Sequence, residues 1–88
     1  MFQPEYSKQF DREYKKFCSS NLEIADKIDE LKADILAHPT YRLGHPERLR
    51  HRKGNEWSRH IDKKNRLVYE IIGNVVWFER CKGHYNDH

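Results

Sequence analysis

Residues 66–80 read RLVYEIIGNVVWFER and carry the strongest strand signals in the chain. Within it, the runs 66–72 and 75–80 are rich in β-branched and aromatic residues, and Gly73-Asn74 separates them. Two such runs joined by two turn-forming residues are typical of a β-hairpin. A turn this short leaves only the antiparallel arrangement. The sequence therefore predicts an antiparallel hairpin at residues 66–80, around which the rest of the chain has to be arranged.

Upstream of the hairpin, turn signals recur about every ten residues and separate two more candidate strands. These signals are Gly44, Pro46, Gly54-Asn55 and Lys63-Lys64-Asn65. The segments between them predict strands at residues 47–52 and 56–62. Residues 1–6 predict a further short strand, which Pro4 confines to an edge of the sheet because proline has no N–H to donate to a neighbouring strand.

Two amphipathic helices are predicted between residues 7 and 38. In the first, over residues 7–18, three aromatic side chains recur at helical spacing: Phe10, Tyr14 and Phe17. The second is predicted to begin at Ser20, which has capping-box spacing with Glu23, and to end at His38-Pro39. Its apolar stripe consists of Ile24, Ile28, Leu31 and Ile35. Both stripes are expected in the core.

The order of these elements predicts an α+β domain, with two N-terminal amphipathic helices packed on a small antiparallel, twisted sheet. With 88 residues, the chain is expected to form one domain, 1–88. Because the helices cover only one face of the sheet, the other face is expected to be open. Along residues 56–62, Arg59 points to one side and His60 to the other, and the sequence leaves open which side the helices cover.

Charge is distributed unevenly along the chain. Residues 1–40 contain six Lys/Arg and eight Asp/Glu, a balance of −2. Residues 41–88 contain eleven and six, a balance of +5, together with five of the six histidines. A basic half suggests an anionic partner such as nucleic acid, although a solvated lysine-rich surface would look the same.

Neither a metal site nor a membrane segment is indicated. Cys18 and Cys81 are expected as reduced thiols, and the histidines lack the paired spacing of zinc ligands, so no metal and no cofactor are expected. No stretch approaches the roughly 18 apolar residues of a membrane helix. A cytoplasmic location without membrane contact is therefore expected.

RNA can be cut without a metal ion, because its own 2′-OH can attack the adjacent phosphate. An enzyme then supplies a base for the 2′-OH, an acid for the departing 5′-oxygen and cations for the phosphate. The C-terminal half offers Glu47 as base, His84 as acid, and Arg50, Arg59 and Arg66 for the phosphate. Taken singly, each residue is also explained as a solvated acid, a strand-edge charge or a tail residue.

Four short blocks strengthen the catalytic interpretation: HPERLRH at 45–51, WSRHI at 57–61, RLVY at 66–69 and His84-Tyr85. In order and spacing they resemble K-P-E-x-L-[KR]-H, W-S-R-R-I, R-L-V-Y and a terminal H-Y of the YoeB/Txe branch of RelE-type bacterial toxins. The close resemblance covers about residues 43–85, whereas residues 1–40 match only in pattern. It implies a RelE/ParE-like fold and a metal-independent endoribonuclease that cuts messenger RNA on the ribosome.

The resemblance also implies roles by position. Glu47 matches the general base, His84 the general acid, Arg66 the transition-state arginine, and Tyr85 the aromatic residue that stacks on or orients the RNA near the cut. The positions that would bind RNA are Arg50, Arg59 and His60. The implied partners are a cognate antitoxin, the ribosome with messenger RNA, and operator DNA only through the antitoxin complex. Whether the toxin works as a monomer or a homodimer is left open.

This chain departs from the family pattern in three places. His60 stands where an arginine is typical, so it either contacts a phosphate with a charge that titrates near pH 6.5 or lies on the helix-covered face. Lys63-Lys64 occupies a turn that is often acidic. Asn86-Asp87-His88 follow the terminal His-Tyr pair, which makes His88 a second, weaker candidate acid.

Two other functions remain open at this point. Relatives that resemble ParE inhibit DNA gyrase by binding, but they have no need to assemble Glu47, Arg66 and His84. A plain RNA-binding module would stack bases on aromatic residues of the sheet. The candidates for such stacking are Trp57, Tyr69, Trp77 and Phe78, which are expected in the core instead.

Overall fold

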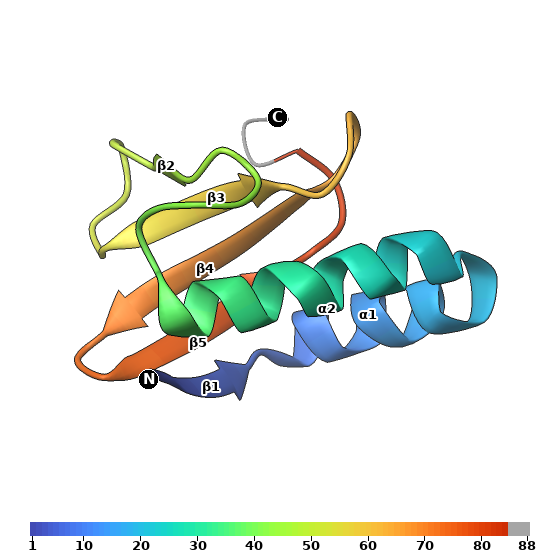
Figure 1. The fold of residues 1–88 in the computed structure, drawn as a ribbon, viewed down its shortest axis with the longest axis horizontal. Helices are drawn as coiled ribbons and strands as arrows, with labels where there is room; N and C mark the ends of the chain where they lie inside the picture. The colour runs from blue at the N-terminus through green and yellow to red at the C-terminus, as the bar shows by residue number, and fades with distance from the viewer. Residues whose placement is uncertain (85–88) are drawn as a thin grey trace.

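The computed structural model describes residues 1–84 and has two layers, a five-stranded sheet and two helices that cover one of its faces (Figure 1). The strand order is β1-β5-β4-β3-β2, in which β1 runs parallel to β5 and the other neighbours are antiparallel. In chain order, the elements are β1 (Gln3–Tyr6), α1 (Lys8–Ser20), α2 (Leu22–Ala37), β2 (Glu47–Arg48), β3 (Glu56–His60), β4 (Arg66–Ile72) and β5 (Val75–Arg80). The predicted α+β class is confirmed.

The hairpin forms with the predicted bounds, and Gly73 in its turn has a φ of +60°. The first strand lies at the edge of the sheet, as Pro4 predicted. Two strands are shorter than predicted: β2 ends at Arg48 instead of residue 52, and β3 at His60 instead of residue 62. Beyond β2 the chain turns back on itself, because the N–H of Arg52 donates to the carbonyl of Leu49 at 3.4 Å.

The predicted start of α2 is wrong by one residue. Ser20 is the last residue of α1, and its hydroxyl donates to the carbonyl of Lys16 at 2.7 Å. The residue that caps α2 is Asn21, whose side-chain oxygen accepts from the N–H of Ile24 at 3.3 Å. The predicted end is confirmed, since His38 is the C-terminal cap.

The apolar stripes of both helices meet the inner face of the sheet. The side chains of this core with at most 1% exposure are Phe10, Ile28, Leu31, Ile35, Leu67, Tyr69, Val76, Phe78 and Cys81. Tyr14, Phe17 and Trp57 pack at its margin. Burying a large apolar side chain contributes about 1.5–3 kcal/mol, so this layer drives the assembly of helices and sheet.

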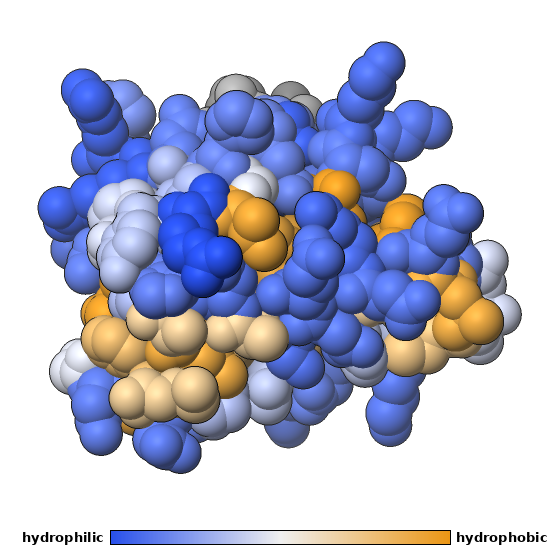
Figure 2. All heavy atoms as spheres, in the orientation of Figure 1, coloured by the Kyte–Doolittle hydropathy of each residue, from blue (hydrophilic) through white to orange (hydrophobic). Residues whose placement is uncertain are grey.

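The surface in Figure 2 is mostly hydrophilic, and apolar residues gather at its lower left, where Figure 1 places the N-terminus and the end of α2. Among residues 1–84, the large hydrophobic side chains that are exposed are Met1, Leu22, Tyr41, Leu43 and Ile72. Neither α1 nor α2 is long and apolar enough to cross a membrane.

Arg59 lies at the centre of the packing between α2 and the sheet, with 0% of its surface exposed. Its Nη1 donates to Asp34 Oδ2 at 2.6 Å, and its Nε donates to the hydroxyl of Tyr69 at 3.2 Å. The carbonyl groups that accept from the guanidinium are those of His38 (2.5 Å), Tyr41 (3.2 Å) and Leu43 (2.9 Å). One arginine thus ties the loop after α2 to β3.

This position corrects the prediction that Arg59 contacts RNA. The carboxylate of Asp34 and three carbonyl groups already occupy its donors, and no part of the side chain reaches the surface. Burial alone would raise the pKa of Asp34, but the hydrogen bonds from Arg59 and from the N–H of Leu43, with the charges of Arg59 and Arg42, hold it below its usual range. The pair is therefore ionised and structural.

Arg59→Ala is expected to lower the free energy of unfolding by about 3–5 kcal/mol, because it leaves Asp34 as an uncompensated buried charge. Arg59→Lys should fall between the parent and Arg59→Ala, since an ammonium keeps the charge but cannot reach all the acceptors. Urea unfolding measures both. The control is Lys27→Ala, which removes the exposed ion pair with Glu30 and should change stability by about 1 kcal/mol or less. A loss in Arg59→Ala no larger than in this control would contradict the assignment.

On the helix-free face, Glu56 at the start of β3 and Glu79 near the end of β5 both lie close to Arg52. Arg52 Nη1 lies 3.3 Å from Glu56 Oε1 and 3.9 Å from Glu79 Oε2. Burial, the hydrogen bond with Glu56 and the charge of Glu56 together raise the pKa of Glu79 to about 7, against the lowering effect of Arg52 and Arg80. Glu79 therefore changes its charge near neutral pH.

Glu79→Gln is expected to flatten the pH dependence of stability. Folded Glu79 holds its proton up to about pH 7, while its ordinary pKa is 4.5. The stability that this raised pKa contributes is present below pH 4.5 and is lost as the pH rises through about 7. Urea unfolding between about pH 5 and 8 should show a smaller decline in Glu79→Gln than in the parent. Equal declines would show that Glu79 titrates normally; Glu5→Gln, on β1, controls for losing one carboxylate.

Candidate active site

Three of the polar residues that the sequence singled out lie on the helix-free face of the sheet. The register pairs Glu47 with Ser58, and His60 with Arg66. Residues directly opposite in an antiparallel pair share a face. Since Arg59 points to the helices, its neighbours Ser58 and His60 point away from them. The alternative that His60 lies on the helix-covered face is therefore wrong.

The Arg66 side chain is only 7% exposed and only partly satisfied. Its Nη1 donates to the carbonyl groups of Asp62 at 2.6 Å and Asn65 at 3.1 Å. Its Nε is buried and has no hydrogen-bond partner among residues 1–84. A buried donor without a partner costs about 1–3 kcal/mol, so this guanidinium is suited to donate to an anionic ligand.

The turn before Arg66 also fixes the approach of the C-terminal segment. Asp62 Oδ1 accepts from the N–H of Asn65 at 2.7 Å. Asn65 Oδ1 in turn accepts from the N–H of Gly83 at 2.9 Å, and the carbonyl of Gly83 accepts from the N–H of Arg66 at 2.9 Å. This exchange holds His84, the next residue, beside the start of β4.

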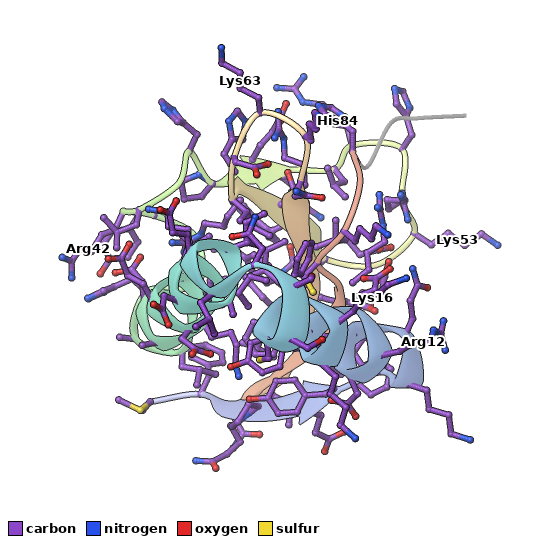
Figure 3. The ribbon with its side chains drawn as sticks, turned by 90° about the vertical axis from the view of Figure 1, so that its right-hand side faces the viewer. Arg12, Lys16, Arg42, Lys53, Lys63 and His84 are labelled. Atoms are coloured by element: carbon purple, nitrogen blue, oxygen red, sulfur yellow. The ribbon has the colours of Figure 1, made fainter. Side chains whose placement is uncertain are left out.

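Figure 3 shows His84 at the same end of the molecule as Lys63 and away from Arg12 of α1. The His84 side chain is half-buried. The segment that leads to it is also held by α1, because the Glu13 carboxylate accepts from the N–H of Cys81 at 2.8 Å. His84 is thus positioned by contacts to both layers of the fold.

His60 lies among charged groups from several elements. Burial lowers its pKa, Arg66, His45 and His84 lower it further, and Glu47 raises it. The net shift is downward, so the imidazole is mostly neutral at pH 7. The ring of His45 lies 5.3 Å from that of His60, centroid to centroid. We refer to these five residues, Glu47, His45, His60, Arg66 and His84, as the candidate site.

The other predicted residues lie elsewhere. Arg50 is exposed in the loop after β2. Tyr85 and His88 lie outside the described residues, so their roles stay predictions. Within residues 1–84, no three His, Cys, Asp or Glu side chains are grouped so that they could hold a metal ion.

Sequence reasoning did not single out two residues of this region. His45 has a left-handed backbone, φ +53°, and its position between Gly44 and Pro46 is the sequence signal that could have identified it. Ser58, opposite Glu47, is fully buried, and its hydroxyl has no partner among residues 1–84. The sequence signal for Ser58 is its place in the block WSRHI, although the block alone assigns the serine no role.

The candidate site combines a carboxylate, three imidazoles and a guanidinium. A carboxylate can accept a proton, an imidazole can donate one, and a guanidinium can neutralise phosphate oxygens. The arrangement therefore suits acid–base chemistry on an anionic substrate.

The chain is similar to a known protein family, to individual relatives and to solved structures. Residues 6–85 match the model of a family described as the YoeB-like toxin of bacterial type II toxin-antitoxin systems. The toxin YoeB of Escherichia coli K12 is 37% identical over 62 residues, which cover 70% of this chain and 74% of that protein. The YoeB dimer from Staphylococcus aureus superposes with a TM-score of 0.86 at 31% identity, covering 96% of this chain and 98% of that one.

The YoeB–YefM complex from Staphylococcus aureus is similar with a TM-score of 0.80 and 32% identity, and the match covers 97% of this chain and 99% of that one. The two structural matches cover nearly the whole chain, not only the four blocks near the candidate site. The chain therefore belongs to the YoeB-like toxins of bacterial type II toxin-antitoxin systems.

Proposed function

We propose that this toxin is a ribosome-dependent endoribonuclease that cuts messenger RNA without a metal ion. The observation that carries the proposal is Arg66, a buried guanidinium whose Nε has no partner within residues 1–84, on the same face as Glu47. A buried guanidinium with a donor still unsatisfied is suited to a phosphate, and RNA presents one beside its own 2′-OH nucleophile.

In the proposed reaction, Glu47 takes the proton of the 2′-OH as this oxygen attacks the adjacent phosphorus. His84 gives a proton to the 5′-oxygen as its bond to phosphorus breaks, which leaves a cyclic phosphate and a free 5′-OH. Arg66 donates to the phosphate oxygens and stabilises the charge that builds on them in the transition state. Arg50, exposed beyond β2, contacts the RNA outside the cut, and Tyr85 stacks on or orients the base beside it.

Two observations favour this function over the alternatives. A toxin that only binds gyrase has no use for a carboxylate, imidazoles and a partly satisfied buried guanidinium gathered on one surface. A plain RNA-binding module would need several exposed aromatic platforms. Of the four candidates, Tyr69 and Phe78 are fully buried, Trp57 packs against the core, and Trp77 is half-buried on β5.

The relatives also supply candidate partners. YoeB of Staphylococcus aureus has been solved in complex with YefM and as a dimer. We propose by analogy that an antitoxin encoded beside this toxin binds and inhibits it in the cytoplasm, and that operator DNA is contacted only by their complex. Pairing of two toxin copies is a further possibility that the dimer supports.

Glu47→Gln and His84→Gln are each expected to slow cleavage by about 100-fold or more, because each removes one proton-transfer group. Arg66→Lys should slow it by a similar factor, since an ammonium cannot reproduce the guanidinium contacts. Cleavage of messenger RNA in purified translating complexes measures all three. Glu23→Gln and His38→Gln, outside the candidate site, serve as controls. Full activity in all three variants, each folded by its thermal unfolding curve, would refute the catalytic assignment.

Cleavage is expected to be weak on naked RNA and strong on translating complexes. The net charge of +3 offers few phosphate contacts, so the protein alone should hold RNA weakly. The test compares initial rates on the same messenger RNA, free and ribosome-bound, at one salt concentration. Equal rates would show that the ribosome is not needed.

A further inference from the structure

The segment Gly44–Pro46 is built tightly onto the start of the candidate site. The carbonyl of Gly44 accepts from the N–H of His60 at 2.7 Å. Gly44 has a φ of +77°, and a Cβ placed there would lie 2.9 Å from Leu31 Cδ2 and 3.1 Å from the carbonyl oxygen of His60. Only glycine fits this contact, so the loop is fixed against α2 and β3 at this point.

His45 follows in the left-handed region, with φ +53°. This conformation costs a residue other than glycine about 1 kcal/mol or more, and such residues cluster at functional sites. Pro46 follows His45, and its ring fixes the backbone φ angle immediately before Glu47. The backbone around His45 is therefore set by its neighbours, and the side chain is exposed beside the ring of His60.

The two imidazole rings are 5.3 Å apart between centroids and tilted by 47°. Rings at this separation can each donate an N–H to the same small anion. The groups that face His60 are Arg66 of β4, Glu47 of β2, His45 and His84. Arg66, His45 and His84 disfavour protonation of His60. An anion bound between the rings would offset this repulsion and favour the protonated form.

We propose that His45 and His60 together bind one phosphate group of the RNA substrate, as a pair of imidazole donors that takes up a proton when the phosphate arrives. This inference rests on the proposed function, and it adds His45 as a substrate-binding residue. In the bound state, an N–H of each ring donates to a phosphate oxygen, and Arg66 remains available for the phosphate at the cut. Binding should therefore be tighter in mildly acidic solution than above neutral pH.

The test uses an oligoribonucleotide that is 2′-O-methylated throughout, which the protein can bind but not cut. Uptake of one proton predicts binding about tenfold tighter at pH 6 than at pH 8. His45→Asn keeps a residue that tolerates the left-handed region and removes the imidazole. It should weaken binding at pH 6 by about tenfold and change binding at pH 8 by about twofold at most. His60→Arg should bind at pH 8 as tightly as the parent does at pH 6.

A second measurement does not depend on any variant. In NMR titrations of the parent, the ring signals of His45 and His60 should titrate at higher pH when the oligoribonucleotide is added, and those of His38 should not move. Unchanged ring titrations, or a His45→Asn variant with the pH profile of the parent, would overturn the inference. Cleavage of translating complexes by the same parent sample tests the proposed function separately. Absent cleavage refutes that function, whereas cleavage with pH-independent binding refutes only the histidine pair.

Discussion

The buried guanidinium of Arg59 donates hydrogen bonds to α2, to the loop that follows it and to Tyr69 of β4. It joins three parts of the chain that are far apart in sequence: Asp34 on α2, the loop at residues 38–43, and β3 itself. A buried guanidinium is tolerated when its N–H donors all have acceptors. For Arg59, three of these acceptors are carbonyl groups of the segment that leads to Gly44. The same contacts that neutralise Arg59 therefore set where the candidate site begins.

The two faces of the sheet differ in how well their buried polar groups are satisfied. Arg59 of β3 faces the helices, and its hydrogen bonds are satisfied. On the other face, Ser58 of β3 and Arg66 of β4 each have a buried polar atom without a partner in residues 1–84. Unsatisfied buried groups destabilise a protein, and a small core has little stability to spare. Their concentration on one face, beside a left-handed histidine, is typical of a surface shaped for a ligand instead of for packing.

Much of the fold could be predicted from the sequence because its signals are local. Hydrophobic spacing and turn residues gave the hairpin bounds, the helices and the edge position of β1. The strand β2 was overextended because its pairing depends on a loop that folds back at Leu49, and local propensity does not report that. Ser20 was preferred over Asn21 as a cap because both residue types suit the position, and only the backbone path decides between them.

The candidate site was predictable in part for the same reason. Glu47, His60 and Arg66 could be placed on strands by alternation, but alternation alone did not say which face the helices cover. Arg59 looked like a surface cation because arginine is rarely buried, and its partner Asp34 lies 25 residues away in the sequence. His45 was missed because its importance comes from a backbone conformation that Gly44 and Pro46 impose together.

The pairing of β1 with β5 has a consequence for how the protein comes into being. The first strand to be synthesised lies parallel to the last, so residues 3–6 have no neighbour in the sheet until residues 75–80 exist. Contacts this distant along the chain form late in folding, since the whole intervening chain must close into a loop first. Until residues 75–84 have been synthesised, the sheet lacks the strand that joins β1 to β4, and the candidate site lacks His84.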